Sequence, residues 1–209
     1  MKTIVWDYNG TILDDVGIAV RIENEMLKKR GLFAGYTVED YRNLFDIPME
    51  NYYRKIGYTF TTESFEDIGV EFYHLYDHYF SECKLNEGIQ NKLEEAVRKG
   101  YQNVILSSCA HENLVKQCKQ LNIDSYFKEI MGVDNYIGGS KVEIGRNWLQ
   151  KNQIDPDECI YIGDTNADYE TAKALNIEKI YLISQGHQSY ERLKKLHTHT
   201  YQSILEVNL

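Results

Sequence analysis

The sequence predicts an α/β fold, a doubly wound parallel sheet with a small helical domain inserted after its first strand. Short apolar runs rich in β-branched residues recur along the chain, and such runs are typical of strands buried on both faces of a parallel sheet. Helical patterns lie between the later runs, and this alternation is the order of a doubly wound sheet. The predicted strands are 3–6, 103–106, 129–131, 159–162 and 179–183.

Four helices are expected among the later strands. Gly100 ends the first of them, and the third stops before Pro156, in keeping with the usual positions of these two residues just beyond a helix. The predicted helices are 87–99, 111–121, 140–151 and 166–175.

Residues 14–83 have a different character, because they contain no convincing strand. Their helical stretches are 16–30, 37–45, 48–56 and 62–80. This segment holds 14 acidic against 7 basic residues and 14 of the 26 aromatic residues of the chain, enough to supply the core of a small domain. We therefore expect a helical cap domain at 14–83, inserted into a core domain made of 1–13 and 84–209.

The composition excludes several classes of partner. A net charge of −9 argues against nucleic acid or an anionic membrane, since both demand a basic face. No apolar run approaches the ~18 residues of a membrane span. The four cysteines show no CxxC spacing and the N-terminus has no secretion signal, which favours a cytoplasmic protein with reduced thiols. We expect a monomer or homodimer that acts on a small molecule.

Polar residues gather where the predicted strands end, at the edge where an open parallel sheet binds ligands. Carboxylates at Asp7 and Asp164 suit Mg²⁺, which takes one or two carboxylates together with waters and phosphate oxygens. Gly10 and Thr11 close the first loop tightly, with backbone amides available to phosphate. The segments are Asp7-Tyr8-Asn9-Gly10-Thr11, Ser107-Ser108, Gly138-Gly139-Ser140-Lys141 and Gly163-Asp164-Thr165-Asn166-Ala167-Asp168.

These four motifs, in this order and with a cap after the first strand, resemble the haloacid dehalogenase superfamily in its phosphoglycolate-phosphatase-like branch. The resemblance implies Asp7 as the nucleophile that forms an aspartyl-phosphate. It implies Ser107 as a phosphate-binding hydroxyl, with Ser108 beside it in the same loop, and Lys141 as the lysine that neutralises nucleophile and phosphate.

The same resemblance implies a Mg²⁺ site. Asp7 and Asp164 would be its carboxylate ligands, and Asp168 would bind the metal or orient its shell. In the family the backbone carbonyl two residues after the nucleophile also contacts the metal, which here is the carbonyl of Asn9.

Asn9 departs from the family pattern, in which phosphatases carry an aspartate that serves as general acid and base. Asparagine can orient a water or donate a hydrogen bond, but it does not exchange a proton near neutral pH. Three explanations stay open: a slow phosphatase, an enzyme whose leaving group needs no acid, and a binding or regulatory protein that kept the scaffold. Dehalogenase or phosphonatase chemistry is less favoured, and the latter would need Lys28, Lys29 or Lys55 as a Schiff base.

Substrate choice is expected to lie in the cap. Arg42, Arg54 and Lys55 are the candidates to contact a second anionic group, although each alone fits a solvated helix face equally well. Asp14 and Asp15 are expected to cap the first cap helix. The predicted function is a Mg²⁺-dependent phosphatase of small phosphorylated metabolites, with a catalytically weakened phosphate-binding protein as the alternative.

Overall fold

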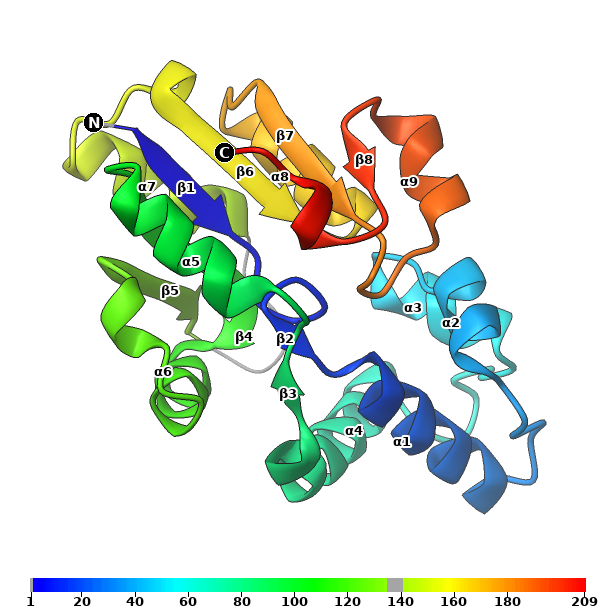
Figure 1. The fold of residues 1–209 in the computed structure, drawn as a ribbon. Coiled ribbons are helices and arrows are strands. Elements are labelled where there is room, and N and C mark those ends of the chain that lie inside the picture. Colours follow the sequence, from blue (N-terminus) through cyan, green and yellow to red (C-terminus); the bar gives the residue numbers. More distant parts are fainter. Residues whose placement is uncertain (1, 135–140) are drawn as a thin grey trace.

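A six-stranded, wholly parallel sheet forms the centre of the computed structural model, which describes residues 2–134 and 141–209. Its strand order is β5-β4-β1-β6-β7-β8, so the first strand lies in the middle and the chain winds outward in both directions (Figure 1). This arrangement confirms the predicted doubly wound α/β class. The strands are β1 (Thr3–Trp6), β4 (Gln102–Ala110), β5 (Glu129–Val133), β6 (Cys159–Gly163), β7 (Lys179–Ile183) and β8 (Thr200–Tyr201).

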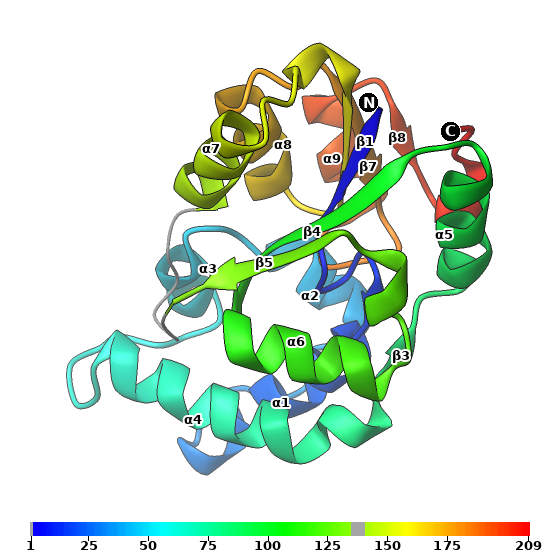
Figure 2. The same cartoon turned by 90° about the vertical axis from the view of Figure 1, so that its left-hand side faces the viewer.

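Helices cover both faces of the sheet, because successive strand residues point to opposite sides. In β1, Ile4 and Trp6 join one apolar cluster with α5 and α6, whereas Val5 joins a second cluster with α7 and α8. Figure 2 shows these two layers on either side of the strands. The helices are α5 (Ile89–Arg98), α6 (His111–Gln120), α7 (Lys141–Lys151), α8 (Asn166–Ala174) and α9 (Tyr190–Leu196).

Each strand predicted from the sequence lies within an observed strand, but two later elements were missed. The sequence did not indicate α9 or the two-residue strand β8, which extend the sheet beyond β7. Four short 3-10 helices connect other elements of the described chain: η1 (Phe80–Glu82), η2 (Asp124–Tyr126), η3 (Pro156–Glu158) and η4 (Ile204–Glu206).

The inserted segment folds as helices that lie beyond the carboxyl ends of the strands (Figure 1). Capping boxes begin α2 at Thr37 and α4 at Ser64, where each side chain accepts a hydrogen bond from the backbone amide three residues later. The helices are α1 (Val16–Lys29), α2 (Val38–Leu44), α3 (Met49–Lys55) and α4 (Phe65–Tyr79). Aromatic side chains of the helices and of the loops between them pack together as a core that includes Tyr41, Phe45, Tyr52, Tyr53, Tyr58 and Phe65.

Two short strands stand where the chain leaves for this segment and returns from it. β2 (Leu13–Asp14) pairs antiparallel with β3 (Lys84–Leu85), so the two connections run side by side. We propose that this pair divides a core domain of residues 1–13 and 84–209 from a cap domain of residues 14–83. In the part of the chain that the structure describes, no helix is long and apolar enough to span a membrane.

Candidate active site

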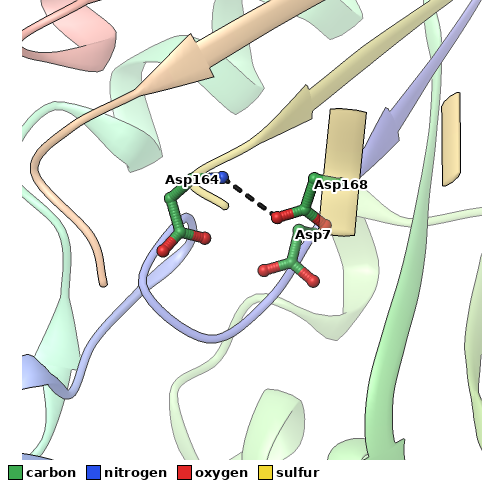
Figure 3. Close-up of side chains that lie close together, drawn as sticks. All are labelled: Asp7, Asp164 and Asp168. Atoms are coloured by element: carbon green, nitrogen blue, oxygen red, sulfur yellow. Dashed lines mark hydrogen bonds between the residues drawn. The ribbon is translucent and has the colours of Figure 1, made fainter. Parts of the chain in front are cut away.

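Three buried aspartates meet at the carboxyl ends of β1 and β6. Asp7 follows β1, Asp164 follows β6, and Asp168 lies in the first turn of α8 (Figure 3). They are 5%, 0% and 1% exposed, and each offers a carboxylate oxygen that lies within 4.8 Å of those of the other two. Three carboxylates withdrawn from water at such short range form a site for a hard cation.

Strand register brings two of these carboxylates together. Trp6 at the end of β1 is opposite Ile162 of β6, and the Asp7 amide donates to the Ile162 carbonyl at 2.8 Å. Asp7 and Asp164 therefore leave neighbouring strands almost level with each other, although 157 residues separate them in the sequence.

The third carboxylate is oriented by a helix start. Thr165 is the N-cap of α8, and Asp168 completes its capping box by accepting from the Thr165 amide at 3.0 Å and the Thr165 hydroxyl at 2.7 Å. Both bonds use Oδ2 of Asp168, so Oδ1 is left to face the cluster. This geometry explains why an acid three residues after a threonine can serve both the helix and the site.

Lys141 at the start of α7 joins two of the aspartates. Its ammonium donates to Oδ1 of Asp7 and, at 2.7 Å, to Oδ1 of Asp168. The Tyr161 hydroxyl also donates to Oδ1 of Asp168, at 3.3 Å. The sequence placed Lys141 beside Asp7, and the structure brings them into direct contact. The preceding residues Gly138-Gly139-Ser140 lie outside the described residues.

Burial and the neighbouring charges shift the pKa values of the three aspartates. Burial and the Asp168 charge raise the pKa of Asp7, against the opposing effect of Lys141. Burial also raises the pKa of Asp164, to about 6. Burial acts in the same direction on Asp168, but Lys141 and Thr165 outweigh it and lower the pKa of that carboxyl. A divalent cation among the three would offset the remaining charge and favour the ionised form of each.

The first loop is shaped around Asp164. The Thr11 hydroxyl donates to Oδ1 of Asp164 at 2.8 Å, so this side chain holds the acid in place. Gly10 has φ +74°, and a Cβ there would overlap the same carboxylate. Asn86, which sequence reasoning missed, donates its amide to the carbonyls of Gly10 at 2.7 Å and Thr11 at 3.0 Å. An Asn after a two-residue strand gives no recognisable signal in the sequence.

Ser107 and Ser108 differ in their surroundings. Ser107 is 1% exposed, lies two residues beyond the partner of Trp6 on β4, and accepts from the Cys109 amide at 3.1 Å. Ser108 is exposed. Both serines lie within β4 and not in a loop after it, but the pairing between β4 and β5 becomes irregular between Leu106 and Ala110, where they stand.

The side-chain amide of Asn9 bonds to two residues outside the aspartate cluster. Its Nδ2 donates to Oδ2 of Asp15 at 2.8 Å and to the Tyr76 hydroxyl at 2.9 Å. Asp15 also accepts from the Gly10 amide at 2.9 Å and the Tyr76 hydroxyl at 2.6 Å. Asp15 is the N-cap residue of α1, as expected, but its side chain makes no cap hydrogen bond and instead lies 2% exposed against the first loop. Asp14 is exposed.

A loop after β7 completes the surroundings of the site and was not predicted. The His187 amide donates to Oδ2 of Asp164 at 2.7 Å, and its ring nitrogens contact Asp15 at 3.2 Å and the Tyr41 hydroxyl at 2.9 Å. A Cβ on Gly186 would overlap Asp164. The Gly-His pair three residues beyond the end of a predicted strand is the signal that would have identified this loop.

The cations expected to choose the substrate are engaged elsewhere. Arg42 donates to the carbonyls of Gly186 at 2.8 Å and Gln185 at 2.5 Å, so it fastens α2 to the core loop. Arg54 pairs with Glu50 and Lys55 pairs with Asp46, each at 2.6 Å. The side chains of Arg54 and Lys55 are largely exposed in these pairs, at 53% and 42%.

Comparison with known proteins agrees with this geometry. The family model of the haloacid dehalogenase-like hydrolases matches residues 4–182. A phosphoglycolate phosphatase of Vibrio vulnificus is 25% identical over 183 residues, which cover 83% of this chain and 79% of that protein. A phosphorylated carbohydrates phosphatase of Thermotoga maritima is 21% identical over 184 residues, which cover 87% and 84%.

The fold recurs in a crystal structure of a predicted phosphatase from Clostridium acetobutylicum. The TM-score is 0.78 at 20% identity, and the match covers 98% of this chain and 95% of the other. Because the family model spans most of the sequence and includes all four motifs, the resemblance is confirmed: the chain belongs to the haloacid dehalogenase-like hydrolases.

Proposed function

We propose that this hydrolase is a Mg²⁺-dependent phosphatase of small phosphorylated metabolites that works through an aspartyl-phosphate on Asp7. The observation that carries the proposal is the contact of the buried Asp7 carboxylate with the Lys141 ammonium, beside two further acids. A carboxylate placed at a strand end with a cation at hand is equipped to attack phosphorus and to tolerate the charge that arrives with the substrate.

The donor set fits Mg²⁺, because it offers only oxygen ligands and an uncompensated negative charge. Asp7, Asp164 and the backbone carbonyl of Asn9 would hold the ion, with Asp168 at its edge. When bound, Mg²⁺ would supply charge neutralisation for the phosphoryl group. Thr11 and the His187 amide keep Asp164 fixed through the bonds described above.

In the proposed reaction, a carboxylate oxygen of Asp7 bonds to phosphorus as the bond to the leaving oxygen breaks. Lys141 offsets charge on both Asp7 and the phosphoryl oxygens, and the Ser107 hydroxyl binds one of these oxygens. Water then attacks phosphorus, which releases phosphate and restores the Asp7 carboxylate. The helices α1 to α4 would cover the site from the side of the strand ends. The four unpaired cysteines favour a reducing compartment, and we propose the cytoplasm.

The test is phosphate release from a panel of small phosphate esters in the presence of Mg²⁺. Asp7→Asn is expected to abolish turnover, whereas Asp14→Asn, which changes an exposed acid nearby, should leave it unchanged. If the unmodified protein releases no phosphate from any ester of the panel, or if Asp7→Asn retains full activity, the proposed function is wrong.

Phosphate-ligand binding without turnover is the second candidate, and the amide at Asn9 is the observation that favours it. Calorimetry that detects tight binding of inorganic phosphate or a phosphate ester without hydrolysis would support this candidate. The phosphonatase alternative loses support, because Lys29 and Lys55 form ion pairs on the outside of the cap and Lys28 is exposed.

A further inference from the structure

The side-chain NH₂ group of Asn9 is fully hydrogen-bonded within the protein. Both of its amide hydrogens have partners, Oδ2 of Asp15 at 2.8 Å and the Tyr76 hydroxyl at 2.9 Å. Tyr76 in turn donates to the same Asp15 oxygen at 2.6 Å, which closes a three-membered ring of hydrogen bonds. Asn9 can therefore offer the reaction only its carbonyl oxygen Oδ1, which is an acceptor.

The carboxylate of Asp15 favours asparagine over aspartate at position 9. A carboxylate at position 9 would have to face the buried Asp15 carboxylate at the distance where Asn9 now donates, and two like charges in that contact repel strongly. Asp15 also fixes the Gly10 amide at 2.9 Å, so it serves as a positioning residue for the whole first loop. Asn9 and Asp15 form one unit, in which the acid stands at position 15 and the amide at position 9.

Other groups that carry a proton near Asn9 are either bonded or poor acids. The Tyr8 hydroxyl has no hydrogen-bond partner, but burial raises the pKa of Tyr8 far above its usual range. Lys141 bridges Asp7 and Asp168, and the ring nitrogens of His187 face Asp15 and Tyr41. Residues 135–140, which complete the sequence before Lys141, contain no carboxyl, imidazole or ammonium side chain. The residues that the structure describes around the nucleophile thus provide no free acid to meet a departing alkoxide.

We propose, building on the phosphatase function above, that the substrate is an activated phosphate whose leaving oxygen departs as a stable anion, such as an acyl phosphate. Asp7 forms its bond to phosphorus while the bond from phosphorus to the acyl oxygen breaks, and the electron pair of that bond stays on the carboxylate that leaves. Water then adds to phosphorus and the Asp7–phosphorus bond breaks. The proton lost by the water passes to the phosphate product or to the solvent, while Oδ1 of Asn9 accepts a hydrogen bond from the water.

The expected discrimination is large. A positioned general acid contributes about 10²–10⁴-fold when the leaving group is a poor one, and a carboxylate needs no such help because carboxylic acids have pKa values of about 4. The unmodified protein should therefore hydrolyse acetyl phosphate at least ~100-fold faster than glycerol phosphate under the same Mg²⁺ concentration.

The experiment measures kcat/KM for acetyl phosphate, glycerol phosphate and a series of aryl phosphates whose phenols differ in pKa. For the unmodified protein we expect rates that fall steeply as the pKa of the leaving group rises. The double variant Asn9→Asp with Asp15→Asn restores an acid at position 9 without the carboxylate contact, so its dependence should be shallower. A flat dependence in the unmodified protein, or equal slopes in the two proteins, would overturn the inference.

Two further measurements test the phosphatase function and the pairing of Asn9 with Asp15 separately. Asp7→Asn must lose acetyl phosphate hydrolysis, and if it does not, the proposed function fails regardless of any slope. The single variant Asn9→Asp should melt at a lower temperature than the unmodified protein at pH 8, and Asp15→Asn should restore the melting temperature. If Asn9→Asp melts unchanged at pH 8, the two side chains do not act as one unit and the inference falls.

Discussion

Glu23 on α1 carries an ionisable group into the aromatic core formed by the inserted segment. Its side chain is 2% exposed, and Oε2 has no hydrogen-bond partner among the described residues. Burial raises the pKa of Glu23 to about 8, although a hydrogen bond from Tyr53 and the charge of Arg30 act in the opposite direction. The perturbation that tests this feature is Glu23→Gln, which keeps the shape and removes the ionisation.

The sign of the effect follows from proton binding. The folded protein holds a proton on Glu23 up to about pH 8, whereas the unfolded chain loses it near pH 4.5, so the stability present below pH 4.5 is lost as the pH rises to about 8. Each pH unit in this window lowers the free energy of unfolding by about 1.4 kcal/mol. At pH 7 the ionisation of Glu23 therefore lowers the free energy of unfolding by about 3 kcal/mol relative to its value below pH 4.5. For a chain of this length that is a melting temperature lower by about 6–12 °C.

The assay is thermal unfolding of both proteins between pH 5 and pH 8, with Glu25→Gln as the control because Glu25 is an exposed acid on the same helix. An unpaired amide in the core costs about 1–3 kcal/mol at every pH, so Glu23→Gln can begin below the unmodified protein at pH 5. Between pH 5 and pH 8 the free energy of unfolding of Glu23→Gln should then rise by about 4 kcal/mol relative to that of the unmodified protein. Parallel pH profiles for Glu23→Gln and the unmodified protein would show that Glu23 does not bind a proton in the folded state between pH 5 and pH 8.

Three other predictions concern the site itself. Gly186→Ala should weaken Mg²⁺ binding at least ~10-fold in calorimetry, because its Cβ would displace Asp164. The control Gly17→Ala has open space around the new Cβ and should leave Mg²⁺ binding unchanged. Equal affinities of the two variants would contradict the role of Gly186. Mg²⁺ at about a hundred times its Kd should raise the free energy of unfolding by about 3 kcal/mol, and EDTA or Asp164→Asn should remove the gain in thermal unfolding. Asn86→Ala should lower stability by about 2–3 kcal/mol and reduce kcat, since two loop carbonyls lose their donor; unchanged unfolding in urea would argue against that role.

The sequence was informative where a residue type and its position along a strand decide the outcome. Asp7 and Asp164 could be paired in advance because each follows an apolar run, and parallel strands end at one edge. The apolar runs themselves define the central strands, whereas β8 has only two residues and leaves no periodic pattern to detect.

The rest depends on contacts that close only in three dimensions. The neighbours of Asp15 in the sequence predict a helix cap. In the folded protein its carboxylate instead contacts Tyr76 and His187, which are distant in the sequence. The sequence pattern around Arg42 predicts a cation on the surface of a helix. In the folded protein the loop after β7 lies beside it, and Arg42 donates to the carbonyls of Gly186 and Gln185. Propensity and spacing carry no information about partners so far away in the chain.

The capping box of α8 has a consequence for how the site is assembled in time. Thr165 and Asp168 are three residues apart, so the contact that aims Oδ1 of Asp168 closes a loop no longer than one helical turn. Such local contacts form in microseconds or less, whereas the meeting of Asp7 with Lys141 waits for the closure of a 134-residue loop. We expect one carboxylate to be oriented in the nascent chain before the others arrive, so that the slow step of folding needs only to bring the nucleophile and the lysine to it.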